Sequence, residues 1–235
     1  MRMVFTPDWF LNNDVLIEII SFMVLFLFFL FSVKCYNANK KKSILYLGFG
    51  FLLIAMGELS TILTKLVLYY DTGITREIGQ AVMTSQIVET VDIFYYLGFF
   101  FNRFLTLLGL YIIYKIPAEK KLSTDFFLII YLLLVTAFLS NSIYYIYHLT
   151  ALILLVLIIR NYYRIYLENN LSNTKILITS FSLMLISQTI FLFAELNFLY
   201  ITAKVLQLVS YITLLILIVK ILKNGKKEKP HRHTA

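Results

Sequence analysis

Long apolar runs, broken by short polar segments, dominate the pattern of hydrophobic and polar positions along this chain. A helix of about 17 to 25 apolar residues can cross the roughly 30 Å hydrocarbon core of a bilayer. The pattern therefore predicts an all-α fold of seven membrane-spanning helices that form one domain over residues 1–222. The predicted spans are 15–36, 43–70, 91–116, 122–139, 143–159, 176–194 and 200–222, followed by a basic tail at 223–235.

A different pattern lies between the second and third spans. Ile74, Ile78, Val82 and Ile87 recur there at helical spacing, with polar residues between them. Residues 71–90 should therefore form an amphipathic helix. It either lies on the outer surface or extends the third span outward.

The composition agrees with a membrane protein. The chain has 235 residues, of which 60% are hydrophobic and only 14% are charged. In a typical soluble domain, about half of the residues are hydrophobic and about a quarter are charged. The net charge of +8 would suggest a nucleic-acid partner in a soluble protein. Here the basic residues instead follow the membrane topology, so we expect the lipid bilayer as partner and no nucleic acid.

The basic residues predict the orientation in the cell membrane. The segments at one face contain sixteen Lys and Arg side chains, whereas those at the other contain Arg2 and Arg76, with Lys65 near the boundary. By the positive-inside rule, the N-terminus lies outside and the C-terminus is cytoplasmic. The first 14 residues lack the features of a signal peptide, so we expect the first span to be retained. The basic face would meet a cytoplasmic protein or anionic lipid.

Arg103 stands in the middle of the apolar third span. A guanidinium keeps its proton, and its burial in a membrane costs roughly 2.5 to 3.5 kcal/mol, so it needs a partner, water or a route to an interface. At about 1.5 Å of rise per residue, Glu58 of the second span lies at nearly the same depth. The count predicts an ion pair between Glu58 and Arg103.

Other polar residues gather at the same depth or further outward, whereas the inner halves of the spans are aliphatic and aromatic. This distribution predicts a polar cavity that opens outward above a hydrophobic plug. His148 lies near the outer end of its span, and Lys65 should reach the interface as a solvated group. The candidate ligand-binding residues are Glu58, Arg103, Gln188, Lys204 and Gln207.

Few chemistries fit this residue set. Outside the tail, His148 is the only histidine, and no hydrolase, zinc or phosphate-loop motif occurs. Lys204 in the last span gives a topological resemblance to the retinal-binding microbial rhodopsins, but Tyr200 stands one turn before it and no acid follows Arg103. We therefore expect no metal, no cofactor and no catalytic residue, which argues against an enzyme.

These observations favour a receptor or sensor that binds a small amphiphilic or anionic molecule in the cavity. A small transporter or an accessory subunit that uses the Glu58–Arg103 pair is the first alternative, and an enzyme that acts on lipids is a weaker one. Polar residues also join membrane helices for purely structural reasons. A structural role for the polar centre therefore stays open at this point.

Overall fold

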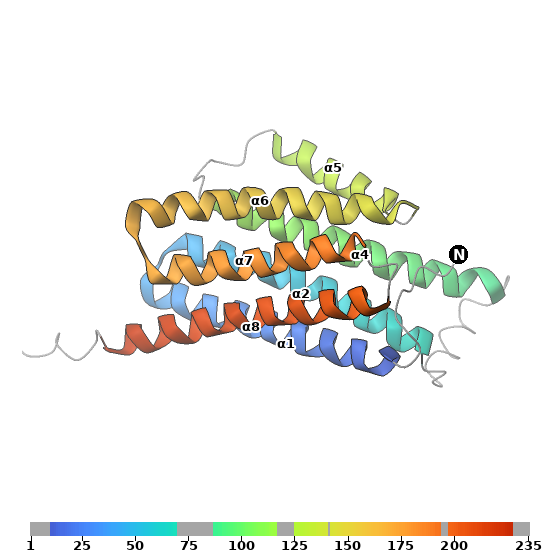
Figure 1. Ribbon diagram of the computed structural model, residues 1–235, viewed down its shortest axis with the longest axis horizontal. Helices are drawn as coiled ribbons and strands as arrows, with labels where there is room; N and C mark the ends of the chain where they lie inside the picture. Colours follow the sequence, from blue (N-terminus) through green and yellow to red (C-terminus); the bar gives the residue numbers. More distant parts are fainter. Residues whose placement is uncertain (1–9, 70–86, 117–124, 141, 194–196, 228–235) are drawn as a thin grey trace, which may run out of the picture.

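The computed structural model describes residues 10–69, 87–116, 125–140, 142–193 and 197–227. All regular structure in these ranges is helical, in agreement with the predicted all-α fold. Figure 1 labels the helices α1 (Leu11–Asn39), α2 (Lys42–Tyr69), α4 (Ile87–Lys115), α5 (Asp125–Leu139), α6 (Tyr144–Asn169), α7 (Ser172–Phe191) and α8 (Asn197–Lys227). Residues 71–86 of the predicted amphipathic helix lie outside the described ranges, and 87–90 belong to α4.

Six of these helices are long and apolar enough to cross a membrane: α1, α2, α4, α6, α7 and α8. The protein is therefore an all-helical, multi-pass membrane protein. The remaining helix, α5, has only 15 residues. At about 1.5 Å per residue, it is shorter than the roughly 30 Å hydrocarbon core.

Some helices extend beyond the predicted spans. Helix α6 continues to Asn169, so only residues 170 and 171 separate it from α7. Asn170 adopts a left-handed conformation (φ 46°) and donates its backbone N–H to the carbonyl of Tyr166 at 2.7 Å, a common way to end a helix. Helix α8 likewise runs to Lys227, into the segment predicted as tail.

Six helices form a closed ring in the order α1, α2, α4, α6, α7, α8 and back to α1, each packed against the next. Helix α5 lies outside this ring, against α4 and α6 (Figure 1). The pairing of α8 with α1 joins the two ends of the described chain. The ring can therefore enclose a space lined by all six helices.

Helices α4 and α6 run in the same direction. Arg103, near the middle of α4, donates to Ser140 just before α6, while Tyr114 at the end of α4 accepts from Asn161 in the second half of α6. Since α4 ends at the end of the ring opposite to the one where α6 begins, the chain between them must return along the length of the ring. This connecting segment carries α5. The length of α5 lies along that return path (Figure 1).

An apolar core fills the ring away from the α6 N-terminus. Four aromatic rings cross it in contact: Phe28 of α1 with Phe51 of α2 (4.4 Å between centroids), Phe51 with Phe181 of α7 (6.1 Å), and Phe181 with Tyr162 of α6 (5.9 Å). Buried aliphatic side chains complete this layer, among them Leu25, Ile54, Leu110, Leu155 and Leu214. This core is the hydrophobic plug that the apolar inner halves of the spans predict.

Glycines allow α2 and α4 to approach closely. A Cβ atom on Gly109 of α4 would lie 2.5 Å from the carbonyl oxygen of Gly50, and one on Gly57 of α2 would lie 3.0 Å from the carbonyl oxygen of Asn102. Small residues commonly bring membrane helices together in this way. This contact fixes the position of the α4 side chains against α2.

The close contact predicts that Gly109→Val destabilises the protein by about 1 to 3 kcal/mol, the usual cost of overpacking. The same β-branched residue at the exposed position Ala38, in Ala38→Val, should have little effect. Thermal unfolding in detergent measures both. Equal melting temperatures for the two variants would contradict the close packing of α2 and α4.

Candidate functional site

A network of buried charges joins α1 to both of its neighbours in the ring. The Nζ atom of Lys65 in α2 lies 2.6 Å from Asp14 Oδ2 and 2.6 Å from Glu18 Oε1. The same Glu18 oxygen accepts from Nζ of Lys204 in α8 at 2.8 Å. Glu18 is thus held between two ammonium groups, one from each neighbouring helix.

The prediction that Lys65 is solvated is wrong, because its side chain is only 3% exposed. Helix α2 continues to Tyr69, so Lys65 lies about one turn inside its end rather than at the interface. Asp14 was assigned to the polar segment before the first span, but α1 begins at Leu11 and carries Asp14 in its first turn, fully buried. Asp14 and Glu18 are four residues apart in the sequence. This spacing indicates that both carboxylates lie on the same face of a helix.

Glu58 of α2 forms a second cluster with α8. Its Oε1 atom accepts from Gln207 Nε2 at 3.0 Å and from the Tyr211 hydroxyl at 3.5 Å, and Gln207 also lies 2.8 Å from that hydroxyl. The Glu58 side chain is almost fully buried. Neutral donors therefore satisfy this carboxylate across the ring.

The predicted ion pair between Glu58 and Arg103 is wrong. Among the described residues, the ion pairs are those of Lys65 and Lys204 with Asp14 and Glu18. Arg103 instead donates from Nη1 to Ser140 Oγ at 3.1 Å, and Ser140 donates to the carbonyl of Ala137. The depth count placed both residues at one level, but it could not give the direction in which each side chain points around its helix.

The other predicted polar residues also have close partners. His148 Nδ1 lies 2.7 Å from Oε1 of Gln188, which joins α6 to α7. An amide oxygen only accepts, so this assignment places a proton on Nδ1 of His148. The imidazole is further packed against the rings of Tyr144 (4.5 Å between centroids), Tyr147 (4.8 Å) and Phe191 (5.3 Å).

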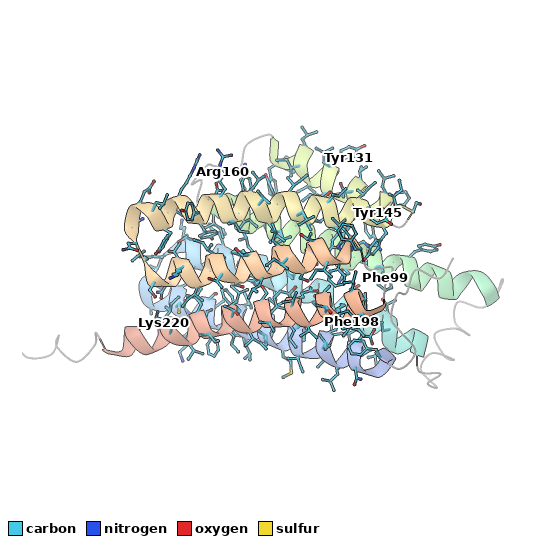
Figure 2. The ribbon with its side chains drawn as sticks, viewed as in Figure 1. Phe99, Tyr131, Tyr145, Arg160, Phe198 and Lys220 are labelled. Atoms are coloured by element: carbon cyan, nitrogen blue, oxygen red, sulfur yellow. The ribbon has the colours of Figure 1, made fainter. Side chains whose placement is uncertain are left out.

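A cavity of about 110 Å³ lies among these groups. All six ring helices line it, and all five predicted ligand-binding residues are part of the lining: Glu58, Arg103, Gln188, Lys204 and Gln207. Figure 2 shows the labelled residue Phe99, which also lines the cavity, toward the opposite end of the molecule from Lys220 and Arg160. The structure thus places the predicted residues around one space, near one end of the ring.

Aromatic residues form much of the cavity surface, which the sequence did not reveal. Tyr144 and Tyr147 line the cavity, together with Phe191 and Tyr200. Tyr145 between them does lie on the exposed surface. The spacing of Tyr144, Tyr147 and His148, three and four residues apart, was the signal for a shared inward face.

Helix α4 turns one face into the ring at the level of the cavity. Arg103, Thr106 and Leu110 are buried, and Phe99 lines the cavity. Tyr96, one turn earlier, is 51% exposed. The inward face of α4 therefore ends at about Phe99 in the part of the helix whose side chains are described.

The described residues offer no cluster of three or more histidine, cysteine or acidic side chains that could hold a metal ion. The cavity instead offers ammonium, guanidinium, amide and phenol donors beside two carboxylates. Such a surface can bind a small polar or charged molecule through hydrogen bonds and charge.

Comparison of the chain with models of known protein families, with curated protein sequences and with solved structures gave no match.

The charge network predicts that Lys65→Met destabilises the protein strongly, because it removes the buried ammonium group that binds both Asp14 and Glu18. Removal of one partner from a buried ion pair costs about 3 to 5 kcal/mol. Lys220→Met is the control, since Lys220 makes an exposed contact with Ser172. Unfolding in detergent should separate the two variants.

A second change provides the critical comparison. Asp14→Asn in the Lys65→Met background removes the excess negative charge and should recover part of the loss, a non-additive result for residues in contact. Additive effects of the two substitutions would contradict a direct pair.

Proposed function

We propose that this protein is a receptor or sensor of the cell membrane that binds a small anionic molecule in the cavity. The observation that carries this proposal is the cavity itself, where Arg103 and Lys204 border one space with the amides of Gln188 and Gln207. Cationic and amide donors are suited to a carboxylate or phosphate group. All six ring helices border the space, so an occupant would contact each of them.

An anion in the cavity can change the contact between helices. Lys204 of α8 binds Glu18 of α1 at 2.8 Å, so the carboxylate of a ligand would compete with Glu18 for the same ammonium group. A ligand that binds more tightly when Lys204 and Glu18 are apart shifts the population of the protein toward that arrangement. The seam between α8 and α1 is therefore the proposed switch, and a cytoplasmic protein or anionic lipid at the basic end would respond to it.

A seventh crossing by α5 is part of the proposal. Helices α4 and α6 point the same way, and their ends are tied by the Arg103–Ser140 and Tyr114–Asn161 contacts. If both cross the membrane, the chain between them must cross as well. Although α5 is short, local thinning of the bilayer accommodates short helices at modest cost.

The distribution of charge supports an outward-facing cavity. The basic residues outside the cavity whose side chains are described gather toward the other end of the ring, where Figure 2 shows Arg160 and Lys220. They are Lys34, Lys40, Lys41, Lys42, Lys115, Arg160, Arg164, Lys175 and Lys220. Positive residues favour the cytoplasmic side. The N-terminus and the cavity would then lie outside, and the C-terminus would be cytoplasmic.

Cysteine labelling tests this topology. In a Cys35→Ser background, which removes the single cysteine, we expect a membrane-impermeant maleimide to label Ser142→Cys on intact cells. It should label Asn170→Cys only after the cells are permeabilised. Both positions are exposed and flank α6. Reversed labelling would contradict the orientation, and equal labelling would contradict a crossing by α6.

Ligand binding is tested on purified protein in nanodiscs with a series of small monocarboxylates and their neutral amides. A carboxylate that binds the folded state raises the melting temperature, with about 2.7 kcal/mol of stabilisation at a concentration 100 times its Kd. This stabilisation should be lost in Arg103→Gln and Lys204→Gln and kept in Arg160→Gln, whose arginine lies far from the cavity (Figure 2). Equal stabilisation by acids and amides would contradict the proposal.

A transporter is the second candidate, and the environment of Glu58 favours it. Glu58 is held by Gln207 and Tyr211 rather than by a cation in the described ion pairs, which suits a group that carries a proton. Uptake of a carboxylate into proteoliposomes under a pH gradient, abolished by Glu58→Gln, would support a transporter function and contradict the receptor function.

A further inference from the structure

One side of the cavity is a continuous aromatic wall. The rings of Tyr144 and Tyr147 contact His148, which stacks on Phe191 at 5.3 Å with 24° between the ring planes. Phe191 in turn meets Tyr200 edge-on at 5.8 Å. Residues of α6, α7 and the first turn of α8 build this wall, and all five rings line the cavity.

The charged side of the cavity comes from other helices. Glu18, Glu58 and Lys65 belong to α1 and α2, which lie across the ring from α6 and α7. Arg103 of α4 and Lys204 of α8 stand between the two sides. The space therefore has an aromatic wall on one side, carboxylates on the other, and a cation at each lateral edge.

This arrangement distinguishes between classes of occupant. Aromatic walls also bind organic cations through their ring faces. Three cationic side chains (Lys65, Arg103 and Lys204) against two carboxylates (Glu18 and Glu58) line this space, so the balance of charge favours an anion. An aliphatic anion would leave the ring faces without a matching surface. An aromatic ring with a negative substituent meets both the wall and the cations.

The size of the cavity suits a ligand with one ring. Its volume is about 110 Å³, close to the roughly 150 Å³ of an engineered protein cavity that takes up benzene. A fused polycyclic molecule or a lipid chain would extend well beyond this volume. A single six-membered ring with one carboxylate is near the upper limit.

We propose that the ligand is a small aromatic monocarboxylate. Its ring lies on the wall formed by His148 and Phe191, and its carboxylate contacts Lys204 or Arg103. This inference rests on the proposed anion-binding function and narrows the anion to an aromatic acid.

Three probes of nearly equal size separate the ring from the charge. Benzoate has both, cyclohexanecarboxylate has the charge without the aromatic ring, and benzamide has the ring without the charge. Calorimetric titration into the full-length protein in phosphatidylcholine nanodiscs should give benzoate an affinity roughly threefold to tenfold above that of cyclohexanecarboxylate, as expected for aromatic stacking. Benzamide should bind more weakly than either acid.

Matched variants locate the ring. Phe191→Leu should remove the preference for benzoate and leave the affinity for cyclohexanecarboxylate unchanged. Phe193→Leu, two residues along on an exposed part of the chain, should keep the preference. If Phe191→Leu fails to fold, Tyr200→Leu tests the same wall.

The outcomes separate this inference from the proposed function. Equal affinities for benzoate and cyclohexanecarboxylate would overturn the aromatic ligand and leave an anion site. Failure of every carboxylate to bind would overturn both. A preference for benzoate that survives in the folded wall variants would place the ligand elsewhere and overturn the assignment to this wall.

Discussion

A carboxylate buried among membrane helices needs hydrogen-bond donors or positive charge around it, and Glu18 has an ammonium group on each of two sides. One of its oxygens lies 2.6 Å from Lys65 and 2.8 Å from Lys204. Since the two lysines belong to α2 and α8, the same carboxylate holds α1 against both neighbours. Loss of either contact would leave a charge in a poorly solvating interior, at a cost of several kcal/mol (roughly 3 to 5). The position of α1, and with it the closure of the ring, depends on this arrangement.

The remaining seams of the ring are also closed by polar contacts. Asn102 donates to the carbonyl of Gly57 between α2 and α4, Arg103 reaches Ser140 beside α6, His148 meets Gln188 between α6 and α7, and Ser187 donates to the carbonyl of Ala203 between α7 and α8. These groups need partners because lipid offers none. A ligand that exchanges one of these contacts therefore acts on a seam between helices.

The apolar runs predicted the helical fold and most helix positions, because the length of a span follows directly from bilayer thickness. Depth counts also placed the five candidate residues at mid-depth or further outward. Neither approach could predict which helix follows which around the ring, since that order depends on close contacts such as Gly50 with Gly109. The error on Glu58 and Arg103 has another origin, because α2 and α4 do pack together but a depth count does not give the direction in which each side chain points around its helix. Lys65 and Asp14 were misread because α2 and α1 extend past their apolar cores, which buries charges that seemed to lie at a boundary.

The central claim is that the charged cavity holds a small acid. Native mass spectrometry of the protein, released from detergent without added ligand, tests this most directly. We expect a bound small acid on the wild type and on Arg160→Gln, and its absence from Lys204→Gln. The same bound species on all three proteins, or phospholipid alone on the wild type, would contradict it.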